Sequence, residues 1–187
     1  MDAGLAAVCG ALAGSVATIG AALATGWSQR ETARISARAE HQRQRHEARH
    51  AAYKALISAT QTLNSVTRGM RHDPQLRDFT PEIAEACAAA ESDIKEVWLE
   101  VVLAGPQNAA RAANAIMHSA NVMKTATEVI ARIQSFQHVG QALTEPTVRD
   151  FIQSFTKAAA RLPEETGRFV DAAHESLSDD GASAVRN

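Results

Sequence analysis

The stretch from His46 to His50 reads His-Glu-Ala-Arg-His, which has the HExxH spacing of helical zinc proteases. In that chemistry, two histidines one helical turn apart bind Zn²⁺ and the glutamate between them activates the metal-bound water. A catalytic zinc also needs a third protein ligand. The position six residues after His50, where one version of the motif has histidine, holds Leu56. No acidic residue occurs between Glu47 and Asp73 either, so a carboxylate ligand on a following helix is missing.

Arginines surround this motif. Arg43, Arg45 and Arg49 would repel a divalent cation. No strand is predicted on which a peptide substrate could align. We therefore expect no catalytic residue, no metal ligand and no cofactor, and interpret the stretch as a solvated helix of mixed charge. A zinc peptidase, and zinc bound adventitiously or between chains by His46 and His50, stay as alternatives.

The remaining residues that could do chemistry are scattered. His118, His138 and His174 fall on separate predicted helices, without a cysteine or carboxylate at ligand spacing. Cys87 falls on the core side of its helix, which predicts an inert buried thiol. With Cys9 as the other cysteine, the chain has no disulfide framework. No glycine-rich phosphate loop or serine nucleophile elbow occurs.

The N-terminal segment is uncharged and apolar. Residues 3–27 carry no charge and are numerous enough to cross a bilayer as a helix. A cleaved signal peptide would place a basic residue before the apolar stretch, but only Asp2 precedes it. Basic residues follow from Arg30 onward, and the positive-inside rule then puts the N-terminus outside. We predict a single-pass protein of the cell membrane, with a transmembrane helix over residues 1–27 and a cytoplasmic C-terminal part.

Two sets of residues around this segment predict contacts. Gly10, Gly14 and Thr18 have the small-xxx-small spacing that lets two helices approach closely, which favours self-association in the membrane. The alternative is a chance occurrence in a segment rich in alanine and glycine. Basic residues just inside a membrane attract anionic lipid headgroups, although a solvated helical stalk with stop-transfer charges explains them as well. The predicted headgroup contacts are Trp27, Arg30, Arg34 and Arg38.

Charge is distributed unevenly along the chain. Residues 28–54 contain seven basic and three acidic side chains, a net charge of +4, whereas residues 55–187 have a net charge of −5. A nucleic-acid-binding domain carries its positive charge on the folded surface. The acidic C-terminal part therefore argues against nucleic acid as a partner.

The chain after the predicted span reads as helices separated by short breaks. No proline or glycine occurs from Ser28 to Thr67, so one long helix is expected there. Thr80 and Thr144 are predicted to begin later helices, and the short break at Gly105 implies antiparallel neighbours. The predicted fold is all-α: a transmembrane helix continuing into a long stalk helix, then an antiparallel bundle of about four helices. The predicted parts are a transmembrane helix over 1–27, a basic helical stalk over 28–51, the bundle over 52–177 and a disordered tail over 178–187.

Apolar residues recur in each bundle helix at alternating spacings of three and four, as in a coiled-coil seam. Pro163 is expected to kink or restart the last helix, which would put Glu164 and Glu165 in a first turn, where acids match the helix dipole. The predicted core positions of two of the helices are Ala52, Leu56, Ala59, Leu63, Val66 and Met70, and Ala109, Ala113, Ile116, Ala120, Met123, Thr127 and Ile130.

The residues from Arg49 to Ile57, RHAAYKALI, are similar to an R-x-x-A-Y-x-x-(F/L)-(L/I) stretch in small actinobacterial single-pass membrane proteins with an Arg-rich helical stalk. The resemblance covers about the first third of the chain, and Leu56 stands where phenylalanine is frequent. It implies the same architecture and no particular activity. Our leading hypothesis is a membrane-anchored interaction or scaffolding module that self-associates and contacts membrane lipid and an unidentified protein. A zinc peptidase and a ligand-sensing or signalling bundle are the alternatives.

Overall fold

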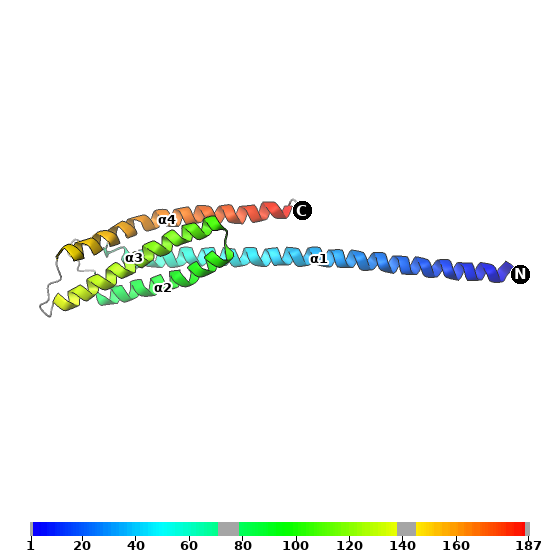
Figure 1. Cartoon of the computed structure of the whole chain (residues 1–187), viewed down its shortest axis with the longest axis horizontal. Helices are drawn as coiled ribbons and strands as arrows, with labels where there is room; N and C mark the ends of the chain where they lie inside the picture. Colours follow the sequence, from blue (N-terminus) through cyan, green and yellow to red (C-terminus); the bar gives the residue numbers. More distant parts are fainter. Residues whose placement is uncertain (1, 71–78, 138–144, 186–187) are drawn as a thin grey trace. The chain divides into compact units, whose positions relative to one another are not determined.

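The structure, a computed structural model, describes the backbone of residues 2–70, 79–137 and 145–185, and the side chains of residues 25–27, 29–70, 79–134 and 148–178. Four helices and no strand occur in these ranges (Figure 1). The helices are α1 (Asp2–Thr67), α2 (Pro81–Ala104), α3 (Gln107–Gln137) and α4 (Glu145–Val185). The chain divides into two compact units, Met1–Arg45 and His46–Asn187.

The second unit is an antiparallel four-helix bundle. The last part of α1 provides its first helix, and consecutive helices run in opposite directions (Figure 1). Helix α3 packs against both α2 and α4, and one continuous apolar core joins all four helices. The predicted all-α bundle of about four helices is confirmed.

Helix α2 begins and ends where the sequence predicts. The Thr80 side chain accepts a hydrogen bond from the Ile83 amide, and Pro81 occupies the first turn, where its missing N–H costs nothing. At the other end, the Gly105 amide donates to the Val101 carbonyl at 2.8 Å. The connection to α3 is therefore only two residues long, which forces α2 and α3 to lie side by side.

The core side of α1 includes polar residues that the predicted seam omits. Thr60 and Thr67 are buried, whereas the predicted positions Ala59 and Val66 are only partly buried. The hydroxyls of Thr60 and Thr67 donate to carbonyls four residues earlier, at 2.7 and 2.9 Å. This internal bond satisfies the hydroxyl, so the side chain can present its methyl group to the core. In α3, by contrast, all seven predicted core positions are buried.

Two aromatic pairs join segments that are distant in sequence. The rings of Tyr53 and Phe169 meet edge to face with centroids 5.6 Å apart, and those of Phe79 and Phe155 with centroids 5.3 Å apart. The Tyr53 hydroxyl also lies 3.1 Å from Ser176 Oγ. Each pair buries large rings in a core otherwise rich in alanine, so these contacts fix α4 against α1 and against the start of α2.

Helix α4 passes through Pro163 without the predicted restart. The helix is continuous from Glu145 to Val185, and the exposed Pro163 lies inside it. The prediction that Glu164 and Glu165 occupy a first turn is therefore wrong. A proline ring on the solvent side leaves a carbonyl that water can reach, which lowers the cost of the missing donor. The α4 backbone also remains helical past Ser178, where the sequence predicts a disordered tail.

The predicted membrane crossing gains no support from the structure. Among the described residues, no helix is both long and apolar enough to cross a membrane. The described part of α1 carries charged side chains in almost every turn from Arg30 to Lys54. The side chains of residues 1–24, which make up most of the predicted span over 1–27, lie outside the described residues.

Two glycines provide a matched test of this packing. A Cβ at Gly105 would lie 2.6 Å from the Val101 carbonyl oxygen and 3.1 Å from the Tyr53 hydroxyl, whereas a Cβ at Gly167 in α4 meets nothing within 4 Å. We expect Gly105→Ala to lower the free energy of unfolding by about 1–3 kcal/mol, because the backbone must move. Gly167→Ala should raise it by about 0.5–1 kcal/mol through helix propensity. Urea denaturation measures both values, and equal effects of the two changes would contradict the packing at Gly105.

Candidate functional site

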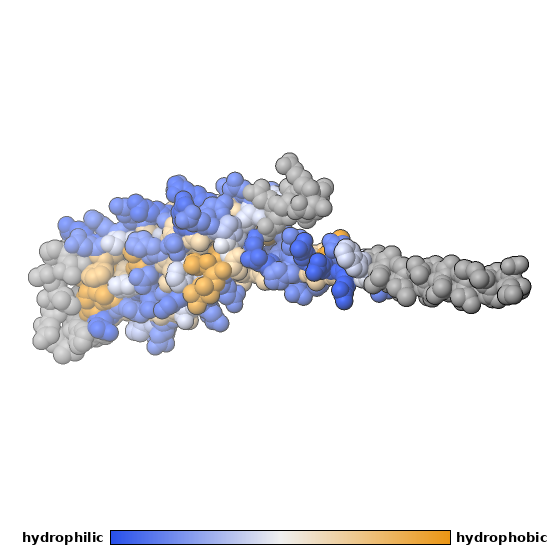
Figure 2. All heavy atoms as spheres, turned by 45° about the vertical axis from the view of Figure 1, so that its right-hand side comes forward, coloured by the Kyte–Doolittle hydropathy of each residue, from blue (hydrophilic) through white to orange (hydrophobic). Residues whose placement is uncertain are grey.

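The exposed side of α2 carries an apolar pair. The side chains of Leu99 and Leu103, one helical turn apart, are 50% and 78% exposed. On the opposite side of the same helix, Ile94 and Val101 are fully buried. Figure 2 shows an apolar patch among the hydrophilic residues of the bundle surface. Single exposed apolar residues are ordinary, whereas contiguous exposed apolar patches mark interaction sites, so this adjacent pair is the candidate surface.

Acidic residues surround this pair. On the helix surface, Glu96 lies three residues from Leu99, and Glu100 lies three residues from Leu103, so each leucine has a carboxylate neighbour. Lys95 is the exposed basic residue of the helix. The exposed acidic residues of α2 are Glu82, Glu85, Asp93, Glu96 and Glu100. We call Leu99, Leu103 and these five acidic residues the α2 face.

A hydrogen bond beside the α2 face holds the helix in place. The half-buried Trp98 donates its indole N–H to Asn114 Oδ1 of α3 at 2.7 Å. Trp98 precedes Leu99 directly, so this bond restricts rotation of α2 about its axis. The α2 face is thereby presented by a rigid element, which lowers the entropy lost when a partner binds.

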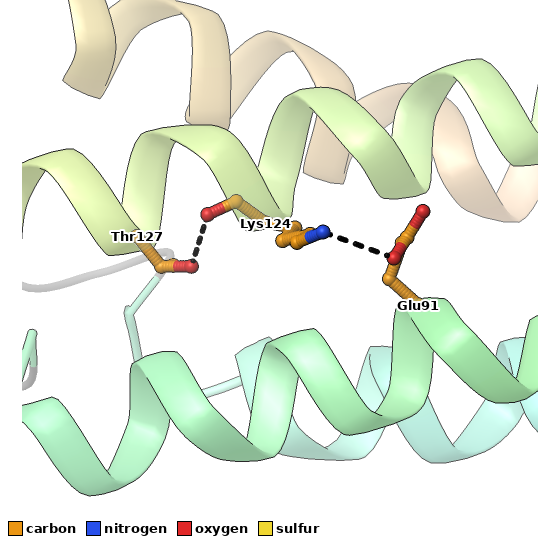
Figure 3. A network of polar contacts seen from close by, with 3 residues as sticks. All are labelled: Glu91, Lys124 and Thr127. Atoms are coloured by element: carbon orange, nitrogen blue, oxygen red, sulfur yellow. Dashed lines mark hydrogen bonds and ion pairs between the residues drawn. The ribbon is translucent and has the colours of Figure 1, made fainter.

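A second group of polar residues lies between α2 and α3. The carboxylate of Glu91, with a side chain only 7% exposed, lies 3.4 Å from Lys124 Nζ (Figure 3). The Thr127 hydroxyl donates to the Lys124 carbonyl at 2.8 Å. Removing a carboxylate from water costs free energy unless a cation and hydrogen bonds compensate it. The pair therefore links α2 to α3 at one position along their length.

Cys87 lies one turn before Glu91 and is fully buried, as the sequence predicts. Burial raises the pKa of the thiol to about 11, against the opposing effect of a hydrogen bond with Thr127. The thiolate is the nucleophilic form of cysteine, and it is scarce near neutral pH at such a pKa. Cys87 is therefore suited to packing and not to nucleophilic catalysis.

The described residues do not form a metal site around the HExxH stretch. His46 is half-buried, and Glu47 and His50 are exposed. Within the described residues, no group of three metal-binding side chains comes together. His118 and His174 are exposed on α3 and α4. His138 lies outside the described residues.

The predicted membrane contacts are described only in part. Trp27 is 77% exposed, and Arg30, Arg34 and Arg38 are exposed, so these side chains are accessible to a lipid surface. Gly10, Gly14 and Thr18 belong to the part of α1 for which only the backbone is described. Headgroup contact and helix association in the membrane therefore stay predictions.

Charged residues of α4 line a surface hollow. Its lining residues are Arg161, Glu164, Glu165 and Arg168. The Arg168 guanidinium pairs with Glu164 across one turn at 2.6 Å. This local pair, and not a helix start, accounts for Glu164. Because all four residues come from one helix and the pair is exposed, the hollow offers little enclosure for a ligand.

Comparison of the chain with protein-family models, with curated proteins and with solved structures found no match. The resemblance based on Arg49–Ile57 gains no support from these comparisons. The α2 face was not predicted from the sequence. The signal was present, because Leu99 and Leu103 fall on the side of the helix opposite the seam through Ile94 and Val101.

The contribution of the buried ion pair can be isolated with a double-mutant cycle. Lys124→Met leaves the Glu91 carboxylate buried without its cation, so we expect the free energy of unfolding to fall by about 1–3 kcal/mol. In a Glu91→Leu background, the same change should cost less than about 0.5 kcal/mol. Urea denaturation of the four proteins gives the coupling energy. Equal costs in the two backgrounds would mean that the pair contributes nothing.

The raised pKa of Cys87 predicts slow alkylation. In a Cys9→Ser background, the folded chain should react with iodoacetamide much more slowly than the urea-unfolded chain at about pH 8, because an unfolded thiol has a pKa near 8.5. The rate for the folded chain should rise as the pH increases toward the value of about 11. A folded-state rate equal to the unfolded rate at about pH 8 would contradict the burial.

Proposed function

We propose that this chain is an interaction module: a helical bundle that binds another protein chain through the α2 face, associates with itself, and is held at the cell membrane by its N-terminal segment. The observation that carries the proposal is the exposure of Leu99 and Leu103, at 50% and 78%, on a helix whose other side is buried in the core. A partner that covers exposed apolar side chains removes their surface from water, and this lowers the free energy of the complex.

The chemistry of the bundle supports binding over catalysis. The buried polar groups between α2 and α3 are occupied with one another, since Glu91 pairs with Lys124 and Cys87 shares a hydrogen bond with Thr127. The HExxH residues are exposed or half-buried on α1. An activated nucleophile or a catalytic metal needs a walled site with several converging groups. Within the described residues, the α2 face is a surface that another chain could bind. The same residues place no group of three metal-binding side chains together, which the zinc-peptidase alternative would need.

Attachment to the membrane is proposed from the sequence. Residues 3–27 carry no charge, and the basic residues begin at Arg30, which favours a cytoplasmic bundle. The exposed Trp27 and Arg30 are suited to the interface and to anionic headgroups. Gly10 and Gly14 would let the segments of two copies approach closely.

Fractionation and crosslinking of cells that express the full chain test this proposal together. We expect the chain to sediment with membranes after a carbonate wash, and a lysine-reactive crosslinker to trap oligomers. Leu99→Asp with Leu103→Asp should weaken association at least tenfold in detergent, because two carboxylates replace the apolar contact. The matched control is Val170→Asp, at a residue that is 41% exposed on α4. A monomeric wild-type chain, or association unaffected by the leucine changes, would contradict the proposal.

A further inference from the structure

We propose that the α2 face binds the basic part of α1, residues 27–45, of a second copy of this chain. This inference rests on the proposed self-association and names the contact that holds it. The two surfaces are opposite in charge, and each presents apolar side chains to solvent.

The basic segment is exposed to solvent along its described length. Every described side chain from residue 29 to 45 is exposed, and the apolar Trp27 and Ile35 are 77% and 59% exposed. Helices obtain most of their stability from packing one face against other elements. The exposed basic residues of the segment are Arg30, Arg34, Arg38, Arg43 and Arg45, against the acidic Glu31 and Glu40.

The spacing of charges on the two helices matches. Arg34 and Arg38 are four residues apart on one helix, and Glu96 and Glu100 are four residues apart on the other. Four residues span about 6 Å along an α-helix, so both pairs can align when the axes run nearly parallel or antiparallel. Ile35 lies between the two arginines in sequence.

The apolar residues would occupy the centre of this contact. With the charges aligned, Ile35 can pack into the groove between Leu99 and Leu103, as side-chain ridges of one helix do on another. The leucines then supply most of the affinity, and the surrounding charges set the register and the choice of partner.

Charge disfavours the symmetric arrangements. Pairing of two α2 faces would bring Glu96 and Glu100 of one copy against the same carboxylates of the other. Pairing of two basic segments would oppose Arg34 and Arg38 in the same way. Like charges at contact are repulsive. The favourable arrangement is therefore a contact between two different surfaces, one from each copy.

A charge-exchange experiment tests this contact between molecules. One full-length variant carries Arg34→Glu and Arg38→Glu, and the other carries Glu96→Arg and Glu100→Arg. Each variant alone opposes like charges at both surfaces. Sedimentation of purified chains in uncharged detergent should show association at least tenfold weaker than wild type for either variant. An equimolar mixture restores opposite charges at both contacts, so its association should return to the wild-type range.

The matched control changes two exposed carboxylates elsewhere on the bundle, Glu128→Arg and Asp171→Arg, which alters net charge equally and should leave association unchanged. If wild type associates and the two variants associate equally well, or if the mixture fails to recover, this inference is overturned while the proposed self-association stands. If wild type is monomeric, the proposed function itself fails. If the arginine changes act only through binding to vesicles containing phosphatidylserine, the basic segment serves a lipid surface and the α2 contact is overturned.

Discussion

The bundle depends on satisfying the polar side chains that its core contains. Alanine is the most frequent residue of the buried core, and Thr60, Thr67 and Thr127 are buried with it, so their hydroxyls are removed from water. Thr60 and Thr67 donate to carbonyls of their own helix, and Glu91 lies against Lys124. A buried polar group that lacks such a partner costs more free energy than a good hydrogen bond contributes. The core can therefore contain these polar side chains because each of them has a hydrogen bond or an ion pair.

The sequence predicts the helices well because their signals are local. The cap at Thr80, the proline that follows it and the break at Gly105 each act within a few residues, and the structure places the ends of α2 there. The seam of α3 is also predicted, since it consists almost wholly of apolar residues. In α1 the predicted positions Ala52, Leu56, Leu63 and Met70 are buried. Thr60 and Thr67 are buried where Ala59 and Val66 were predicted, because threonine counts as polar until its hydroxyl is seen to bond within the helix.

The continuity of α4 was not predictable from local signals, and the α2 face was missed although the seam of α2 indicates it. Pro163 is a helix breaker in isolation, but the apolar side of α4, with Phe155, Leu162 and Phe169 buried, continues on both sides of it. The tertiary packing of these side chains outweighs the local preference of proline. The seam through Ile94 and Val101 identifies the core side of α2 and so places Leu99 on the exposed side. For the HExxH stretch, the sequence already argued against a third ligand, and the described residues bring no group of three metal-binding side chains together.

The ion pair between Glu91 and Lys124 bears on how the helices choose their alignment during folding. The alanines of α2 and α3 discriminate only weakly between alignments, whereas Ile94 and Val101 and the two-residue connection restrict them. A slipped arrangement would separate the Glu91 carboxylate from Lys124 and leave it buried without a cation, which costs free energy. The ion pair thus adds an electrostatic preference for the alignment that the large buried side chains and the short connection also favour.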